Sequence, residues 1–238
     1  MRYPGFGFVA LLMLSHASAL AQQDEPVQSV AVAGTKDPDW KPYRNMVDGL
    51  DAFDKYHNLA PGAALRFVLQ PQKSNLSLAD LKLRIAGDNS NIDVPIAADA
   101  TFSLPRDAAA FKDDADLQLN IRKGLYRWRP DIHTPGIPPD QRRLGDLRLE
   151  CEVRWAVDKF DTSFLARTYL STLGGACHSS RSRVFSTASK PVRSVTLIDG
   201  ERREQLKPER LDAKDPVRYA PPIHDESWSD DTIVKFEF

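Results

Sequence analysis

The chain has 238 residues, of which 42% are hydrophobic and 27% are charged, and its formal net charge is −1 at pH 7. This share of apolar residues is enough for a folded core, which excludes a chain that is disordered throughout. Because acidic and basic residues almost balance, the chain has no overall positive electrostatic field that would attract nucleic acid or an anionic membrane. No nucleic-acid partner is therefore predicted.

The first residues have the layout of a secretory signal peptide. Arg2 precedes an apolar run from Phe6 to Leu14, and small residues follow it up to Ala19-Leu20-Ala21. The apolar run is shorter than the roughly 20 residues that a membrane-spanning helix needs. The pattern predicts cleavage after Ala21 and a periplasmic or secreted protein with no transmembrane helix after cleavage. A buried N-terminal helix is the alternative.

The chain contains two cysteines, Cys151 and Cys177. An oxidising compartment favours a disulfide over free thiols, and two cysteines allow only one pairing. Zinc sites built on cysteine use short paired spacings such as C-x-x-C, which neither cysteine has. We therefore predict a structural disulfide and no metal or catalytic role for the thiols, with free buried thiols as the alternative.

Three segments follow from composition and pattern. Residues 1–21 are the predicted signal peptide, and residues 22–62 form a lead-in segment that contains an amphipathic helix. Residues 63–238 are predicted to form a β-rich domain, with a possible further boundary between residues 130 and 145. Within the lead-in, the short apolar piece from Val30 to Val32 is a candidate edge strand.

Two stretches have the three- and four-residue apolar spacing of helices. The first covers residues 43–62, with Asn45 as its cap and Pro61-Gly62 as its end. The second covers residues 161–175, with Asp161 or Thr162 as its cap and Gly174-Gly175 as its stop. Their predicted apolar stripes are Met46, Leu50, Phe53 and Tyr56 or His57 in the first helix, and Phe164, Leu165, Tyr169 and Leu173 in the second.

Most other apolar residues alternate with polar ones, which is typical of half-buried antiparallel strands. The most regular alternation runs over residues 147–157, "LECEVRWAV" with two residues before it, and predicts a strand. Asp199-Gly200 predicts a hairpin with a type I′ turn. The other predicted strands lie at residues 65–69, 81–85, 92–96, 101–105, 116–124 and 232–238.

About ten strands with two inserted helices predict a mainly β fold, β-sandwich-like and antiparallel, with an α+β fold as the alternative. The stretch "IDVPIAADATFSLP" resembles the strand-turn-strand of transthyretin-like and carboxypeptidase-regulatory-like modules. Asp99, Phe102 and Leu104 match that pattern, and Thr101 stands where it has glycine. The resemblance covers at most residues 76–124. It implies an Ig-like β-sandwich that binds or spaces, and it carries no catalytic residue.

No catalytic or cofactor motif is present: the chain lacks G-x-S-x-G, H-E-x-x-H and a P-loop. Neither a metal site nor a cofactor is therefore predicted. Basic and aromatic residues alternate in "RKGLYRWRP", beside a Pro-rich loop, and such a pattern can form a binding surface. The alternative is an ordinary strand with solvated arginines. The candidate ligand-binding residues are Tyr126, Arg127, Trp128, Arg129 and His133.

The predicted function is that of an exported envelope accessory protein that acts by binding a protein partner or a glycan. A hydrolase of cell-wall or glycan substrates is the first alternative, and it would require carboxylates or a nucleophile and base in one pocket. The second alternative is a small outer-membrane β-barrel, suggested by the terminal "TIVKFEF". No particular oligomeric state is predicted.

Overall fold

The fold is mainly β, as the sequence predicted, and every strand pairing is antiparallel. The computed structural model describes residues 37–73 and 76–238, and these belong to one compact unit. The predicted signal peptide and the candidate strand Val30–Val32 lie outside the described residues. Within the described ranges the chain forms 13 strands and four α-helices, against the predicted ten and two.

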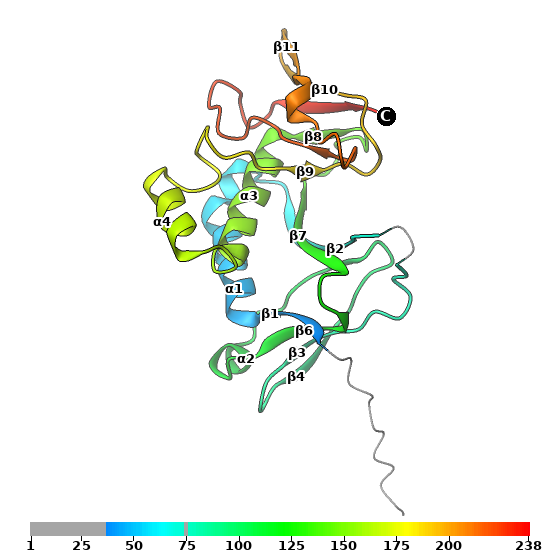
Figure 1. The fold of residues 1–238 in the computed structure, drawn as a ribbon, viewed down its shortest axis with the longest axis vertical. Helices are drawn as coiled ribbons and strands as arrows, with labels where there is room; N and C mark the ends of the chain where they lie inside the picture. Colours follow the sequence, from blue (N-terminus) through cyan, green and yellow to red (C-terminus); the bar gives the residue numbers. More distant parts are fainter. Residues whose placement is uncertain (1–36, 74–75) are drawn as a thin grey trace, which may run out of the picture. The chain divides into compact units, whose positions relative to one another are not determined.

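The strands form four sheets, with the orders β1-β6-β3-β4, β5-β2-β7, β11-β10-β13-β8 and β12-β9 (Figure 1). In chain order the strands are β1 (Pro38–Pro42), β2 (Ala64–Pro71), β3 (Leu83–Ala86), β4 (Asn91–Val94), β5 (Thr101–Phe102), β6 (Asp116–Arg122), β7 (Tyr126–His133), β8 (Gln141–Arg143), β9 (Ser186–Thr187), β10 (Ser194–Asp199), β11 (Arg202–Gln205), β12 (Arg218–Tyr219) and β13 (Ile233–Glu237). The helices are α1 (Tyr43–Tyr56), α2 (Ala108–Lys112), α3 (Leu144–Asp158) and α4 (Phe164–Thr172), with 3-10 turns at His57–Leu59 and Pro208–Arg210.

The first hydrophobic core lies between the β1-β6-β3-β4 sheet, the β5-β2-β7 sheet and the helices α1 and α3. Period-two alternation places Phe67 and Leu69 of β2, and Leu117 and Leu119 of β6, in this core. Two sheets that share one core in this way are sandwich-like, in line with the predicted fold class. The segment that resembles transthyretin-like modules supplies β3 to β6, and the resemblance itself stays a prediction.

A second core lies between α3 and the β11-β10-β13-β8 sheet. Val195 and Leu197 of β10 face Val234 and Phe236 of β13, its partner strand. The terminal strand β13 is therefore an inner strand of this sheet, with β10 on one side and β8 on the other. The largest fully buried side chain, Trp228, comes from the loop before β13.

The prediction of a strand at residues 147–157 is wrong, because these residues form most of helix α3. Leu149, Val153 and Val157 pack in the first core, whereas Leu147, Cys151 and the partly buried Trp155 pack in the second. Each set has four-residue spacing, and the two sets are offset by two residues, which is about 200° around a helix. Two opposite helical stripes thus interleave in the sequence and imitate the alternation of a strand.

Arg148 of α3 holds the loop that precedes β13. Its guanidinium donates to the carbonyl oxygens of Ile223, Asp225 and Trp228, at 2.9, 2.8 and 3.0 Å, and pairs with Asp230. The side chain is only 14% exposed. One charged residue of the helix therefore satisfies several backbone acceptors of a loop that has little regular structure of its own.

Helix α1 starts two residues before the predicted cap Asn45. Pro42 ends β1 and occupies the cap position, and Tyr43 is fully buried at the first turn. The Tyr43 hydroxyl donates to Pro105 O and accepts from Asp107 N, both at 2.7 Å. Tertiary packing of Tyr43 thus fixes the start of the helix, and Met46 is buried on the predicted stripe.

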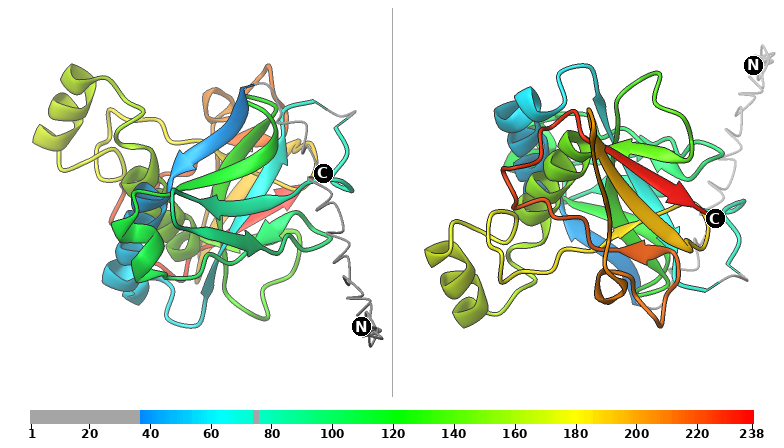
Figure 2. Two further views of the ribbon diagram at one scale, coloured as in Figure 1. Left: turned by 90° about the horizontal axis from the view of Figure 1, so that it is seen from below. Right: turned by 90° about the horizontal axis from the view of Figure 1, so that it is seen from above.

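Helix α4 exists where it was predicted, but its apolar stripe faces outward. Ser163, one residue after the predicted candidates, caps the helix by accepting from Ala166 N. Phe164, Leu165 and Tyr169 are 70%, 78% and 51% exposed. Both views of Figure 2 show α4, in yellow-green, at the periphery of the described structure.

Replacing Leu165 with serine is expected to change the free energy of unfolding by less than about 0.5 kcal/mol, because the side chain is already in solvent. Urea denaturation of the wild-type and Leu165→Ser proteins measures the difference. Leu149→Ala, in the buried stripe of α3, is the contrasting control and should cost about 2–5 kcal/mol. A loss above 1 kcal/mol in Leu165→Ser would mean that α4 packs against the chain.

The predicted disulfide is confirmed: Cys151 of α3 is bonded to Cys177, which follows α4. The predicted hairpin is also present, with Asp199 paired to Arg202. Its turn differs from the prediction, because type I′ requires positive φ at both loop residues. Gly200 has φ of 59°, but Glu201 is not among the residues with positive φ, which is the type II′ pattern. None of the helices in residues 37–73 and 76–238 is both long and apolar enough to span a bilayer.

Candidate ligand-binding cleft

Strand β7 divides the predicted binding residues between its two faces. Tyr126 and Trp128 are 3% and 6% exposed and lie in the first core, where the Tyr126 hydroxyl donates to Ser77 O. Arg127, Arg129 and His133 are on the opposite face. The aromatic part of the predicted surface is therefore buried in the core and not exposed.

Arg129 joins a cluster of arginines from three elements. Arg127 and Arg129 come from β7, Arg154 comes from α3, and Arg218 comes from β12. Burial, followed by the charge of Arg154, lowers the pKa of Arg129 to about 10. Burial also lowers the pKa of Arg154. The negative charge of Asp158 acts in the opposite direction, whereas the positive charges of Arg218 and Arg127 lower the pKa further. These shifts mark four cations close enough to repel one another.

One carboxylate, that of Asp158, pairs with two of these four arginines. Its Oδ2 lies 3.6 Å from Arg129 Nη1 and 3.8 Å from Arg154 Nε, and its Oδ1 accepts from Lys41 Nζ at 2.8 Å. Arg218 has a carboxylate of its own, Asp212, at 2.9 Å. The arginine cluster therefore carries more positive than negative charge, although the chain as a whole is close to neutral.

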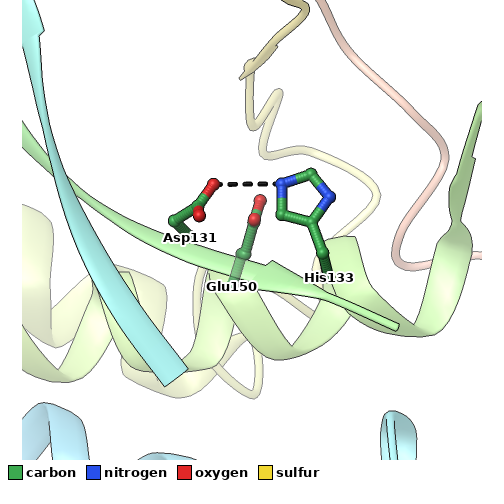
Figure 3. Close-up of side chains that lie close together, drawn as sticks. All are labelled: Asp131, His133 and Glu150. Carbon is green, nitrogen blue, oxygen red and sulfur yellow. Dashed lines mark hydrogen bonds and ion pairs between the residues drawn. The ribbon is translucent and has the colours of Figure 1, made fainter. Parts of the chain in front are cut away.

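Beside the arginines lies a second group, made of Asp131, His133 and Glu150 (Figure 3). Asp131 and His133 are two residues apart on β7 and so share its outward face, and His133 Nε2 lies 3.0 Å from Asp131 Oδ1. Glu150 reaches the same place from α3, and one ligand-type atom from each of the three residues lies within 4.8 Å of the other two. Figure 3 shows the Glu150 carboxylate between the other two side chains.

Arg142 fixes the position of Glu150. Its Nη2 donates to Glu150 Oε1 and to Ile132 O, both at 2.7 Å, while Glu150 Oε1 also accepts from Ile132 N at 3.0 Å. Burial is the largest single influence and alone would lower the pKa of Arg142, but the charges of Glu150, Tyr219 and Asp146 and the hydrogen bond to Glu150 together outweigh burial and raise it. The carboxylate is therefore tied to a guanidinium and to the backbone of β7, which leaves its second oxygen without those bonds.

Arg129 and Arg154 of the arginine cluster and all three residues of the second group line one cleft of about 390 Å³. It is lined by residues of β7 and α3 and by the segment from Val184 to Ser189, which contains β9. Pro139, from the Pro-rich loop that follows β7, also lines it. Its charged and hydroxyl-bearing lining residues are Asp99, Arg129, Asp131, His133, Arg142, Glu150, Arg154, Ser186, Thr187 and Ser189.

Two of these lining residues, Arg129 and His133, were predicted from the sequence because they stand close together on one strand. Glu150 and Arg154 were not predicted, since both stand on the polar face of the wrongly predicted strand 147–157. Their four-residue spacing would have placed them on one side of a helix, had the helix been recognised. No family model matches the chain, and neither does any curated protein or solved structure.

Proposed function

We propose that this chain is an exported envelope accessory protein that binds an anionic glycan in the cleft between β7, α3 and β9. The observation that carries the proposal is the arginine cluster, in which Arg129 and Arg154 share the single carboxylate of Asp158. A ligand carboxylate or sulfate between these guanidinium groups would supply the missing negative charge through charge-assisted hydrogen bonds.

A glycan fits the cleft better than an acidic peptide does. The cleft also contains the carboxylates of Asp99, Asp131 and Glu150, which would repel a chain of consecutive acidic side chains. Sugar hydroxyls donate hydrogen bonds to carboxylates, whereas a uronic acid group pairs with arginine. A ligand with both groups matches both parts of the lining.

Export is supported by the Cys151–Cys177 disulfide, since disulfides persist mainly in oxidising compartments. The pattern of residues 1–21 is that of a cleaved secretory signal, and we propose a periplasmic or secreted location on these two grounds. The role of an accessory protein, rather than an enzyme, rests on the binding residues described above.

The test uses an oligogalacturonate as the anionic probe and a neutral oligosaccharide of equal length as its reference. We expect the wild-type protein to bind the anionic probe, with an affinity that falls as salt is added. Arg129→Gln and Arg154→Gln should each weaken binding about tenfold or more, because each removes a charge-assisted hydrogen bond. Isothermal titration calorimetry measures the dissociation constants.

Arg203→Gln is the matched control, since it removes the same charge from the exposed strand β11, away from the lining residues. Its affinity should equal that of the wild type. Equal binding of the neutral oligosaccharide, or equal losses in Arg154→Gln and Arg203→Gln, would refute the proposal. Tighter binding of an oligoglutamate than of the oligogalacturonate would point to an acidic protein partner instead.

The second candidate function is hydrolysis of the same kind of ligand. It is favoured by one observation, namely that a histidine and two carboxylates meet in the cleft. Glycoside hydrolases use a pair of carboxyl groups, one of which must donate a proton. Release of new reducing ends from the oligogalacturonate, abolished by Asp131→Asn, would establish this function, and binding without release would exclude it for this probe.

A further inference from the structure

We infer that Asp131, His133 and Glu150 form a binding site for a divalent transition-metal ion of the zinc type. The inference goes beyond the proposed function, because the arginines Arg129 and Arg154 would bind an anionic ligand without a metal. It concerns another part of the lining of the same cleft, which consists of one histidine and two carboxylate side chains.

The spacing of the three side chains suits a single ion. Ligand atoms bonded to one zinc ion at about 2.0–2.2 Å lie roughly 3–3.5 Å apart in a tetrahedral arrangement. His133 Nε2 and Asp131 Oδ1 are 3.0 Å apart, and a Glu150 oxygen lies within 4.8 Å of both. A small rotation of the Glu150 side chain about its outer bonds would complete the set (Figure 3).

Rigid elements hold all three ligands. Asp131 and His133 project from the same face of β7, which is paired with β2 along its whole length. Glu150 stands on α3, one residue before the disulfide-bonded Cys151. Arg142 and Ile132 N hold one oxygen of Glu150, as outer hydrogen bonds hold carboxylate ligands in metal sites.

The ligand chemistry selects the class of metal. One imidazole nitrogen and two carboxylate oxygens suit zinc and its neighbours, whereas calcium takes six to eight oxygen ligands. Three protein ligands would leave one tetrahedral position open toward the cleft, as in zinc sites that act on a bound water or ligand. The carboxylates of Asp131 and Glu150 bring two negative charges, which offset the positive charges of the neighbouring Arg142 and Arg154.

A second histidine–carboxylate pair provides an internal control. His178 Nε2 lies 2.8 Å from Glu152 Oε1, in a geometry like that of His133 and Asp131. Within the described part of the chain, no third ligand meets this pair, and the only group of three is that of Asp131, His133 and Glu150. If zinc bound to any surface histidine, replacing either His133 or His178 would weaken zinc binding. If the three residues form a specific site, only replacing His133 would weaken it.

The experiment titrates Zn²⁺ into the chelator-treated full chain, with no glycan present, in competition with a zinc-sensitive dye. We expect one Zn²⁺ per chain, and about tenfold or greater losses of affinity in His133→Ala and Asp131→Asn. His178→Ala should bind as the wild type does. Zinc should also raise the melting temperature of the wild type and of His178→Ala, but not that of His133→Ala.

Glu150 is left unchanged in this test, because Arg142 depends on its charge. The three replaced side chains, His133, Asp131 and His178, are all partly exposed, so the variants should keep the fold. Circular dichroism without zinc checks this. Failure of the wild type to bind Zn²⁺, unchanged binding by His133→Ala and Asp131→Asn, or equal losses in His178→Ala would each overturn the inference. Since no glycan is present, none of these results bears on the proposed function.

Discussion

Replacing both Cys151 and Cys177 with alanine is expected to lower the free energy of unfolding by about 3.5 kcal/mol, because the bond restricts the unfolded chain across a separation of 26 residues. Helix α4 strengthens this expectation, because it lies in the stretch of chain between the two cysteines. Its apolar residues Phe164 and Leu165 face solvent, so packing contributes little to hold the segment in place. Guanidinium denaturation of the two proteins measures the loss.

Reduced and alkylated wild-type protein is the control, because it breaks the same bond without removing the cysteines. Both forms should lose a similar free energy, and α4 should become more sensitive to proteases in both. A loss below about 1 kcal/mol, which is the size of an average point substitution, would show that the packing of α3 alone fixes the loop.

Replacing Arg142 with methionine is expected to cost about 3–5 kcal/mol, the usual penalty for leaving one partner of a buried ion pair without the other. The Arg142 side chain is 10% exposed and that of Glu150 is 16% exposed, so water replaces little of the lost interaction. The Ile132 carbonyl also loses its donor. Urea denaturation followed by tryptophan fluorescence gives the difference from the wild type.

The double variant Arg142→Met, Glu150→Gln should regain part of that stability, because no lone charge remains in the pair. Arg66→Met is the matched control, since Arg66 pairs with Asp99 at an exposed site and should cost only about 0–1 kcal/mol. Equal costs at Arg142 and Arg66 would contradict the buried ion pair, as would a double variant less stable than the single one.

The sequence predicted those parts of the fold that have one face on a core and the other in water. In β2 and β6 the alternation of Phe67, Leu69, Leu117 and Leu119 is a direct consequence of half burial. In helix α3 the same alternation has another cause. Two opposite sides of this helix are buried, so apolar residues occur at every second position, as they do in a half-buried strand. In α4 the capping residues and the two glycines predicted a helix. No local sequence signal shows whether the apolar side of such a helix packs against another element.

The candidate site shows the same limit. Arg129 and His133 were predicted because a single strand carries both on its outward face. Arg154 and Arg218 reach the cluster from α3 and β12, and only the tertiary structure brings them to β7. Tyr126 and Trp128 were placed at the surface because an alternating strand does not reveal which of its faces is inside.

The interleaved stripes of α3 have a consequence for how the protein holds together. Leu149 and Val153 belong to one core, while Leu147 and Cys151 belong to the other, on the same two turns or so of helix. A fluctuation that unwinds these turns removes side chains from both cores at once. A displacement of α3 caused by a change in one core also moves the side chains that α3 places in the other core. The two halves are therefore mechanically coupled, and the cleft lies along the element that couples them.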